Sequence, residues 1–316
     1  KSGGEDTDKV AQIKLGFGYQ TQYSRNNLQL NNGRGAFKEI ALLTQTFATD
    51  WSWSSLIEDF DNDGLSDIFI SNGIYRRPND LDYINYLSNV NFSQYNTNQQ
   101  DALEKKLIEE MPQLNIGNVI LKNEGNFSFS KYSQTAGLKN TYSNGAAYGD
   151  LDLDGDLDLV INNINSPAQI LKNTAESAAQ NFIGLQLTPS KQLPNTQGAK
   201  ISLYSQGKLW YKELTASRGF ASASSQNIHF GLGEMTSIDS ITIDYLGGMQ
   251  QKVSQLAPNQ YHKIDSELAE LSQSKKEEKT PNATAIFPFS HMEDTYYDYE
   301  REPLMLEKLS IEGPAY

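Results

Sequence analysis

Cysteine is absent from the 316 residues of the sequence, so the chain has neither a disulfide framework nor a thiolate metal site. Long hydrophobic runs are also absent, since no apolar stretch approaches the roughly 18 residues of a membrane-spanning helix. Histidine is scarce, with three copies, and there is no Gly-x-Ser-x-Gly elbow, His-Glu-x-x-His helix or Walker loop. These absences argue against membrane-spanning proteins, zinc peptidases, nucleotide hydrolases and serine hydrolases.

Basic residues are fewer than acidic ones: the chain has 26 Lys and Arg and 39 Asp and Glu, which give a formal net charge of −13. Binding of nucleic acid through its phosphates needs clustered Lys and Arg, so nucleic acid is not an expected partner. Nine of the acids lie in two short segments, which makes the net charge partly a sign of metal binding. Abundant Gly, Asn and Ser and few long helical patterns favour a turn-rich β protein.

The two acidic segments, residues 59–67 and 150–158, follow one pattern. Each has Asp at positions 1, 3, 5 and 9 and Gly at position 6. The carboxylates supply oxygen ligands for a hard cation, the Gly permits a sharp turn, and the position-7 residue offers a backbone carbonyl. We therefore expect two Ca²⁺ sites. The candidate metal ligands are Asp59, Asp61, Asp63, Leu65, Asp67, Asp150, Asp152, Asp154, Asp156 and Asp158.

These loops differ from EF-hands at position 12, where an EF-hand needs a bidentate Glu and this chain has Ile70 and Ile161. Asp67 and Asp158 at position 9 must then supply the closing carboxylate. The apolar residues that follow indicate a strand, so each loop is predicted to connect two strands. An acidic, solvated turn without metal is the alternative, and the second copy of the pattern favours the metal.

An internal repeat surrounds the two loops. Leu30 precedes Asp59 by 29 residues, and Leu121 precedes Asp150 by the same distance. A third start, at Ile170, lies 50 residues after its counterpart in the second copy. A period of about 50 residues is typical of a propeller blade or another stacked β unit.

An insertion over residues 73–117 separates the first two copies. Apolar residues at three- to four-residue spacing predict two short helices, the first capped by Asn79 or Asp80 and the second closed by Pro112. These helices either pack on the sheets or form a surface for a ligand or partner. The candidate ligand-facing residues here are Tyr75, Arg76 and Arg77.

Two further candidate ligand-facing residues, Trp51 and Trp53, lie on one face of a predicted strand just before the first Asp loop. Their indoles are suited to stacking against a sugar, and core packing between blades is the alternative. Loss of folding on their substitution would indicate core packing.

Residues 179–265 form a second predicted domain, with all-β character. Gln206 and Gly207 predict a hairpin turn. His229 is expected to be structural or solvent-facing rather than catalytic, and residues 231–233 are expected to form a tight turn. Strands are expected at residues 182–187, 200–204, 209–214, 227–230 and 240–245.

These residues carry a resemblance to two known families. The Asp loops, with Leu-Asn-Asn-Gly upstream of the first and Gly-Ala-Ala-Tyr-Gly directly before the second, resemble FG-GAP or VCBS repeats. That resemblance implies bladed β-propellers whose Asp loops bind Ca²⁺. Four segments of the second predicted domain resemble the ASPIC/UnbV domain: residues 195–201, 217–222, 228–233 and 241–245. This family usually has Trp-Pro where the chain has Tyr245 and Leu246. That departure concerns a detail of packing and does not change the assignment to the family.

The first residue and the composition of the C-terminal region indicate that the sequence is part of a longer protein. Residues 266–285 are charged and poor in apolar residues, which predicts a linker. Residues 286–316 are aromatic and acidic and resemble the lead-in to a further set of FG-GAP repeats. Because the chain begins at Lys1 rather than Met and no third Asp loop follows, we expect a piece of a longer protein with an incomplete propeller.

We therefore predict a mainly β fold: a partial β-propeller over residues 1–178, then a small β-sandwich or barrel-like ASPIC/UnbV domain over residues 179–265. No catalytic residue is expected, and the predicted function is a Ca²⁺-stabilised binding or scaffold module that presents loops to a protein or glycan. Millimolar Ca²⁺ outside cells favours an extracellular location. The resemblance implies a bacterial surface lipoprotein at the outer membrane, in some cases beside a nutrient importer. A subunit of a polysaccharide-processing enzyme, catalytic or not, is the alternative.

Overall fold

The computed structural model of the chain describes residues 8–19, 25–33, 35–132, 137–174 and 180–272. The strands in these ranges form five sheets, none of them closed, and the prediction of a mainly β fold is confirmed. The expected lead-in to further repeats lies outside the described residues, as does most of the predicted linker. Among the helices that the structure describes, none has both the length and the apolar character needed to cross a membrane.

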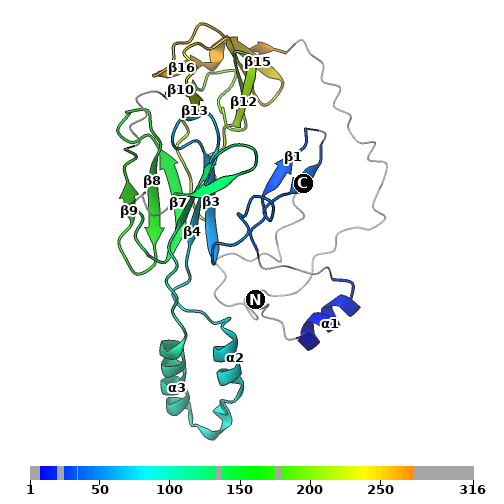
Figure 1. Cartoon of the computed structure of the whole chain (residues 1–316), viewed down its shortest axis with the longest axis vertical. Helices are drawn as coiled ribbons and strands as arrows, with labels where there is room; N and C mark the ends of the chain where they lie inside the picture. Colours follow the sequence, from blue (N-terminus) through cyan, green and yellow to red (C-terminus); the bar gives the residue numbers. More distant parts are fainter. Residues whose placement is uncertain (1–7, 20–24, 34, 133–136, 175–179, 273–316) are drawn as a thin grey trace. The chain divides into compact units, whose positions relative to one another are not determined.

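Each Asp loop joins two neighbouring antiparallel strands, as the sequence predicts (Figure 1). The first loop lies in a four-stranded sheet and the second in a three-stranded sheet. In order across the first sheet, the strands are β3 (Ser52–Glu58), β4 (Asp67–Asn72), β5 (Val119–Asn123) and β6 (Phe129–Lys131). Across the second sheet they are β7 (Ser143–Gly149), β8 (Asp158–Asn163) and β9 (Gln169–Leu171).

The repeated Ile-Leu-Lys-Asn phrase lies at the third strand of each sheet. Ile120 pairs with Phe69 in the first sheet, and Ile170 pairs with Val160 in the second. The sequence spacing assigns this phrase to the start of the following repeat, whereas in the structure it completes the sheet of the preceding Asp loop. The difference arises because a short apolar strand followed by an Asn turn has the same sequence pattern at either end of a repeat.

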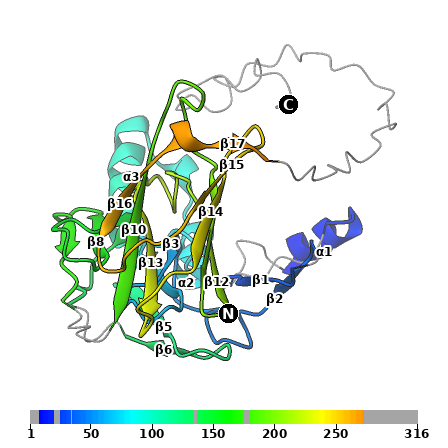
Figure 2. The same cartoon turned by 90° about the horizontal axis from the view of Figure 1, so that it is seen from above.

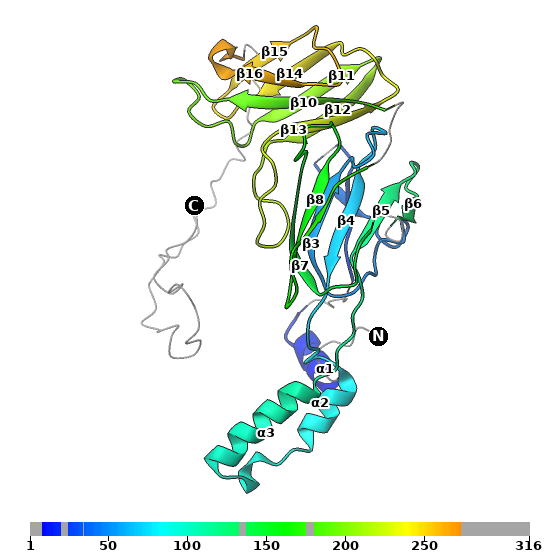
Figure 3. The same cartoon turned by 90° about the vertical axis from the view of Figure 1, so that its left-hand side faces the viewer.

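The two sheets pack face to face (Figure 3). The buried side chains alternate along the strands, as expected for residues that share one face. They are Leu56, Phe60, Phe69, Ile120, Ala146, Tyr148, Leu157, Leu159 and Ile161. The opposite face of the first sheet is also apolar, with Ile68 and Ile70 buried and Ile57 50% exposed. Apolar residues on both faces are typical of a sheet inside a stack.

The insertion after β4 contains the two predicted helices, and the predicted start of the first and end of the second are confirmed. Asp80 caps the first helix by accepting a hydrogen bond from the Tyr83 backbone N–H (3.0 Å). The second helix ends two residues before Pro112, which lacks the N–H that a helix needs. The bounds are α2 (Leu81–Ser88), a 3₁₀ turn η1 (Phe92–Gln94) and α3 (Thr97–Glu110).

This helical hairpin extends away from the sheets instead of packing on them (Figures 1 and 3). Its two helices are joined where the Tyr83 hydroxyl donates to the Leu107 carbonyl (2.7 Å), and both residues are buried. The apolar residues Leu81, Tyr86 and Ile108 remain between 44 and 51% exposed. The hairpin is therefore a projecting element with an apolar surface of its own.

A helix and a small hairpin precede the first sheet. The hairpin repeats the turn of β5 and β6: the Gly33 N–H donates to Asn31 Oδ1 (2.8 Å), as Gly125 does to Asn123 (3.0 Å). The helix was not predicted, because its sequence has little apolar periodicity. The elements are α1 (Asp8–Gly16), β1 (Gln29–Asn31) and β2 (Phe37–Glu39).

The second domain is a sandwich of two sheets (Figure 2). The strand order is β13-β10-β16 in one sheet and β12-β11-β14-β15-β17 in the other. Leu185, Leu203, Phe230 and Ile241 lie in the core between them, each at most 1% exposed. The elements are β10 (Asn181–Thr188), β11 (Lys200–Ser205), β12 (Lys208–Glu213), β13 (Ile228–Gly233), β14 (Ser240–Asp244), β15 (Met249–Val253), β16 (Tyr261–Asp265), η2 (Ser266–Leu268) and β17 (Glu270–Leu271).

The five strands predicted for this domain are present as β10 to β14. The predicted hairpin turn at Gln206 and Gly207 is also present, with left-handed φ angles of 48° and 79°. Other features of the domain differ from the prediction. The tight turn expected at residues 231–233 is wrong, because β13 continues to Gly233. Strands β15 and β16 were not predicted. The two-residue β17, which pairs with β15, lies where the linker was expected to begin.

The packing between the first two sheets predicts a large effect for Ile161→Ala. Ile161 is fully buried in this interface, so the cavity should cost about 2–5 kcal/mol of unfolding free energy, measured by urea denaturation. Ile170→Ala is the matched control, because Ile170 is 70% exposed and should cost about 0.5 kcal/mol or less. Equal losses in the two variants would contradict the packing.

Candidate metal centre

The two Asp loops share one hydrogen-bonded frame. In the first, the position-1 carboxylate of Asp59 accepts from the Gly64 N–H (2.8 Å); in the second, Asp150 accepts from the Gly155 N–H (2.9 Å). The two glycines have φ angles of 89° and 97°, a conformation that other residues rarely adopt. This is the physical reason for Gly at position 6.

The position-9 carboxylates tie each loop to the neighbouring strand. Asp67 accepts from the backbone N–H of Phe60 (3.2 Å) and of Asn123 (2.8 Å). Asp158 has the equivalent bonds, including one from the Asn173 N–H (2.8 Å). The Asn of the Ile-Leu-Lys-Asn phrase therefore fixes the closing carboxylate of the preceding loop, a role that sequence reasoning missed.

Three carboxylates converge in each loop. Oxygen atoms of the aspartates at positions 1, 3 and 9 lie within 4.8 Å of one another in both copies. The position-5 aspartates lie outside these groups, and each instead accepts a hydrogen bond from the backbone N–H of the position-7 residue, Leu65 or Asp156. The two groups are Asp59, Asp61 and Asp67, and Asp150, Asp152 and Asp158.

The electrostatics of the first loop favour a cation. Burial, with a smaller contribution from the neighbouring carboxylates and against the Gly64 hydrogen bond, raises the pKa of Asp59 to about 8. Burial likewise raises the pKa of Asp67 to about 7 and, in the second loop, that of Asp156 to about 6. Asp59 is 4% exposed, and its Oδ1 is buried with no hydrogen-bond partner in the described residues. An unpaired buried oxygen of this kind fits a metal ligand.

Each loop also receives a lysine from the third strand of its sheet. Lys122 ion-pairs with the carboxylates at positions 3 and 5 of the first loop, the latter at 3.5 Å. Lys172 does the same in the second loop, with the position-5 carboxylate at 3.2 Å. The hydrogen bond to Asp61 raises the pKa of Lys122, and that from Lys172 lowers the pKa of Asp152. The repeated Lys-Asn pair in the sequence was the signal for this internal counter-charge.

The first loop lies directly against strand β13 of the second domain. A Cβ atom at Gly231 would lie 1.9 Å from Asp59 Oδ2 and 2.7 Å from the Asn62 Cα, so only glycine fits. The Trp210 indole N–H donates to the Gly64 carbonyl (3.2 Å). The Gly-Leu-Gly sequence of β13 therefore serves a close contact with the loop and not a turn.

The second loop meets the same sheet through aromatic side chains. The Phe182 ring covers Gly155, where a Cβ would come within 2.1 Å of it. The Tyr261 hydroxyl donates to Asp150 Oδ2 (2.8 Å), and burial raises the pKa of that hydroxyl. Phe182 also stacks on His229, with ring centroids 5.3 Å apart. The second domain thus contacts a position-1 aspartate in each loop.

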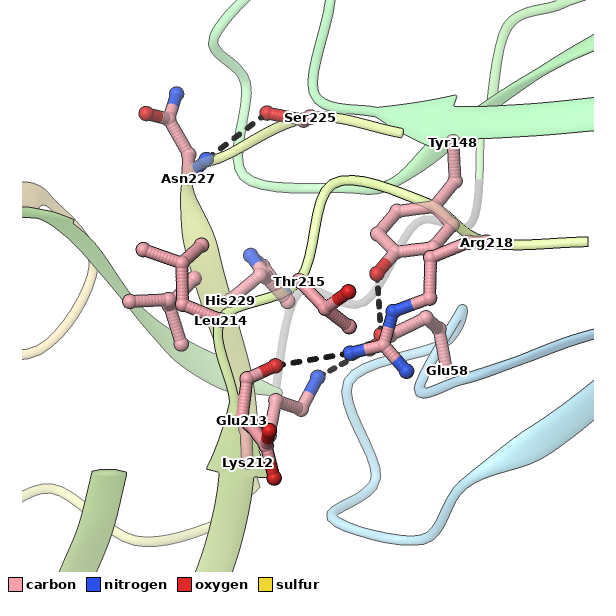
Figure 4. A pocket seen from close by; sticks show the side chains of 11 residues that line it. Glu58, Tyr148, Lys212, Glu213, Leu214, Thr215, Arg218, Ser225, Asn227 and His229 are labelled. Atoms are coloured by element: carbon pink, nitrogen blue, oxygen red, sulfur yellow. Dashed lines mark hydrogen bonds and ion pairs between the residues drawn. The ribbon is translucent and has the colours of Figure 1, made fainter. Parts of the chain in front are cut away.

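A polar cleft lies between the first sheets and the segment after β12 (Figure 4). Glu58 accepts from the Tyr148 hydroxyl (2.6 Å) and ion-pairs with Lys212, and Arg218 donates to a backbone carbonyl (2.9 Å). Burial lowers the pKa of His229 to about 3, so this histidine is neutral. The cavity is about 20 Å³, room for roughly one water molecule. Glu58 is paired with Tyr148 and Lys212, and the cavity is too small for a substrate.

The tryptophans predicted as ligand-facing are largely occupied by contacts within the chain. The Trp53 indole N–H donates to the Gly73 carbonyl (2.6 Å), and its ring centroid lies 4.7 Å from that of Phe220 in the second domain. Trp51 lies 6.3 Å from Trp53, and both are half-buried. Trp53 also lines a cavity of about 250 Å³ together with Ile57 and Ile70. Its packing against the second domain thus leaves part of its surface toward a cavity, and a ligand-facing role stays a prediction.

The other candidate ligand-facing residues anchor the base of the helical hairpin. Arg77 donates to both carboxylate oxygens of Asp50 (2.8 and 2.6 Å). Arg76 donates to the Glu109 carbonyl near the end of α3 (2.6 Å), where a cation complements the helix dipole. Tyr75 meets a second tyrosine ring edge-on at 5.4 Å. All three are half-buried.

Comparison with known families identifies part of the second domain. Residues 190–271 match the family model described as ASPIC and UnbV, so the predicted ASPIC/UnbV domain is confirmed over these residues. They include strands β11 to β17. No curated protein matches the chain. The resemblance of the Asp loops to FG-GAP or VCBS repeats stays a prediction.

The close approach of β13 predicts that Gly231→Ala destabilises the protein. The new methyl group overlaps Asp59 and the Asn62 backbone, and since the backbone cannot rotate away, the cost should be about 1–3 kcal/mol by urea denaturation. Gly16→Ala in α1 is the control, because nothing lies within 4 Å of its added Cβ. An unchanged unfolding free energy for Gly231→Ala would refute this contact.

Proposed function

We propose that this region is a Ca²⁺-stabilised, non-catalytic binding module in which two Asp-loop sheets are attached to an ASPIC/UnbV domain. The observation that carries the proposal is the recurrence of one hydrogen-bonded loop frame that brings three carboxylates together in each copy. A solvated acidic turn would not bury an unpaired carboxylate oxygen as Asp59 does, because burial without a partner is costly. A bound cation supplies that partner.

The chemistry of the donor set favours Ca²⁺. All the converging ligands are carboxylate oxygens, with no His or Cys among them, which disfavours Zn²⁺. Ca²⁺ accepts six to eight oxygen ligands in flexible geometry, whereas Mg²⁺ demands a near-ideal octahedron. Asp63, Asp154 and the position-7 carbonyls are proposed to complete the shells once the lysines release the carboxylates at positions 3 and 5. The cation would be structural, since it fixes the connector between two strands.

We propose further that the two sheets are neighbouring blades of a β-propeller. The internal repeat supports this reading. Ile57, Ile68 and Ile70, on the opposite face of the first sheet, stand 91 residues before the three residues with which the second sheet packs on the first. Leu28, in the segment that precedes the first sheet, packs against the cluster of Ile68 and Ile70, and a preceding sheet of the same kind would cover Ile57 as well. Blades stacked by one recurring interface are the building principle of a propeller.

For the setting, we propose the surface of a bacterial cell, with a protein or glycan as partner. Weak, open Ca²⁺ loops suit the millimolar Ca²⁺ outside cells. The family resemblance supports an outer-membrane lipoprotein, in some cases an accessory of a nutrient importer. The projecting hairpin of α2 and α3, with Leu81, Tyr86 and Ile108 exposed, is the proposed partner surface, since exposed apolar patches mark protein contacts.

A catalytic role is not proposed for this region. The acids that cluster are bound into the loop frames, and Glu58 is paired with Tyr148 and Lys212. A glycosidase needs two carboxylates separated across an open sugar site, which the water-sized cleft beside Glu58 does not offer. The larger cavity beside Trp53, of about 250 Å³, has no acidic residue in its lining and so offers a glycosidase no carboxylate.

The proposal predicts that chelation lowers stability. At free Ca²⁺ of about 100 times the dissociation constant, each site should add roughly 2.7 kcal/mol to the unfolding free energy. The full chain in EDTA should therefore melt at a lower temperature by scanning calorimetry, and returning Ca²⁺ should restore the melt. Isothermal titration should give two sites per chain.

Two variants test the assignment of the ligands. Asp61→Asn should remove binding at the first site and its share of the Ca²⁺ stabilisation, because position 3 loses a charged ligand. Asp101→Asn, on the exposed face of α3, changes the net charge equally and should leave both unaffected. A melting temperature that is the same in EDTA and in Ca²⁺ would sink the metal assignment.

A further inference from the structure

The fourth position distinguishes two otherwise matching Asp loops. Asn62 and Leu153 occupy it with the same left-handed backbone, at φ angles of 60° and 62°. Asn adopts this conformation readily and Leu does not, yet the loop frame forms in both. Asn62 is 2% exposed and Leu153 is 70% exposed. The frame itself does not require Asn here, so the role of Asn62 lies outside its own loop.

Asn62 connects three parts of the molecule. Its side-chain NH₂ donates to the Gly155 carbonyl (3.1 Å) and to the Asp156 carboxylate (2.8 Å), both in the second loop. With both amide hydrogens used, its Oδ1 must accept, and it accepts from His229 Nε2–H of β13 (2.7 Å). The Asn62 carbonyl accepts from the Gly233 N–H (2.8 Å). Every polar atom of this side chain is therefore satisfied, in one orientation.

The groups that Asn62 contacts belong to the frame of the second site. Gly155 carries the N–H that holds the position-1 aspartate, and Asp156 carries the N–H that holds the position-5 aspartate. A reverse connection runs from Asn173, which fixes the closing Asp158, to the carbonyl of Phe60 next to Asp59 (2.6 Å). Neither loop can change its frame without displacing hydrogen bonds to the other.

We propose that the two cation sites are coupled, so that Ca²⁺ at one raises the affinity of the other, with Asn62 and His229 as the positioning residues between them. The inference rests on the proposed function. A cation that orders the first loop holds Asn62 in place, and the second loop is then ordered before its own cation arrives. Since part of the ordering cost has already been met, the second ion binds more tightly. Linkage requires the effect to be reciprocal.

Calcium titration of the full chain by isothermal calorimetry, after removal of bound ions, tests the coupling. The wild type should bind two ions with a Hill coefficient above 1. Asp59→Asn, which disables the first site, should weaken the second by about 5-fold or more, and Asp150→Asn should weaken the first by the same factor. Equal affinity of each remaining site in the variants and the wild type would overturn the coupling and leave the proposed function standing. Absence of any Ca²⁺ binding to the wild type would overturn both.

The route through Asn62 has its own test. Asn62→Ala should remove the cooperativity while two ions still bind, and Leu153→Ala, at the matched exposed position of the second loop, should leave it intact. Circular dichroism of each variant checks folding. Should Asn62→Ala fail to fold, His229→Gln keeps a donor near the same place and should retain cooperativity, whereas His229→Leu should lose it. Cooperativity that persists in Asn62→Ala or His229→Leu would refute this route.

Discussion

The contact on which the arrangement depends is the close approach of β13 to the first Asp loop. Side chains alternate along this strand: Phe230 and Leu232 point into the sandwich core, while His229, Gly231 and Gly233 face the loop. A strand whose loop-facing positions carry almost no side chain lets the backbone lie against a buried carboxylate. The His-Phe-Gly-Leu-Gly phrase therefore has a physical explanation in the shape of its neighbour.

The internal repeat has produced two loops that are equal in frame and unequal in surroundings. In the first, the position-1 aspartate lies under a glycine strand; in the second, it accepts a bond from Tyr261. The lysines and the closing asparagines occur in both, so they belong to the repeat. Asn62 and the aromatic contact of Phe182 occur once, so they belong to the junction between the domains. Comparison of the two copies therefore separates the residues that every Asp-loop sheet shares from those that depend on where the sheet lies in the molecule.

Much of the fold followed from local sequence patterns. The Asp loops, the strands after them, α2 with its Asp80 cap and strands β10 to β14 were all predicted, because each depends on residues close together in the chain. The contacts of the candidate site were not, because they join distant segments: His229 lies 167 residues from Asn62. A pattern of Gly at alternate positions is compatible with a turn or with a close-packed strand, and only the neighbour decides which.

The open faces of the two sheets have a consequence for self-association. Ile57 is half-exposed on the outer face of the first sheet. Ile170 is exposed on the outer face of the second sheet, and its position in that sheet is equivalent to that of Ile120, which packs between the two sheets. These two outer faces differ from each other and correspond in sequence to the two faces that pack together between the sheets. A contact between copies made through them would be head-to-tail, and such a contact either closes into a ring or grows without limit. The turn between successive sheets, set by the twist of their strands, decides between a closed ring of fixed number and an open-ended fibre.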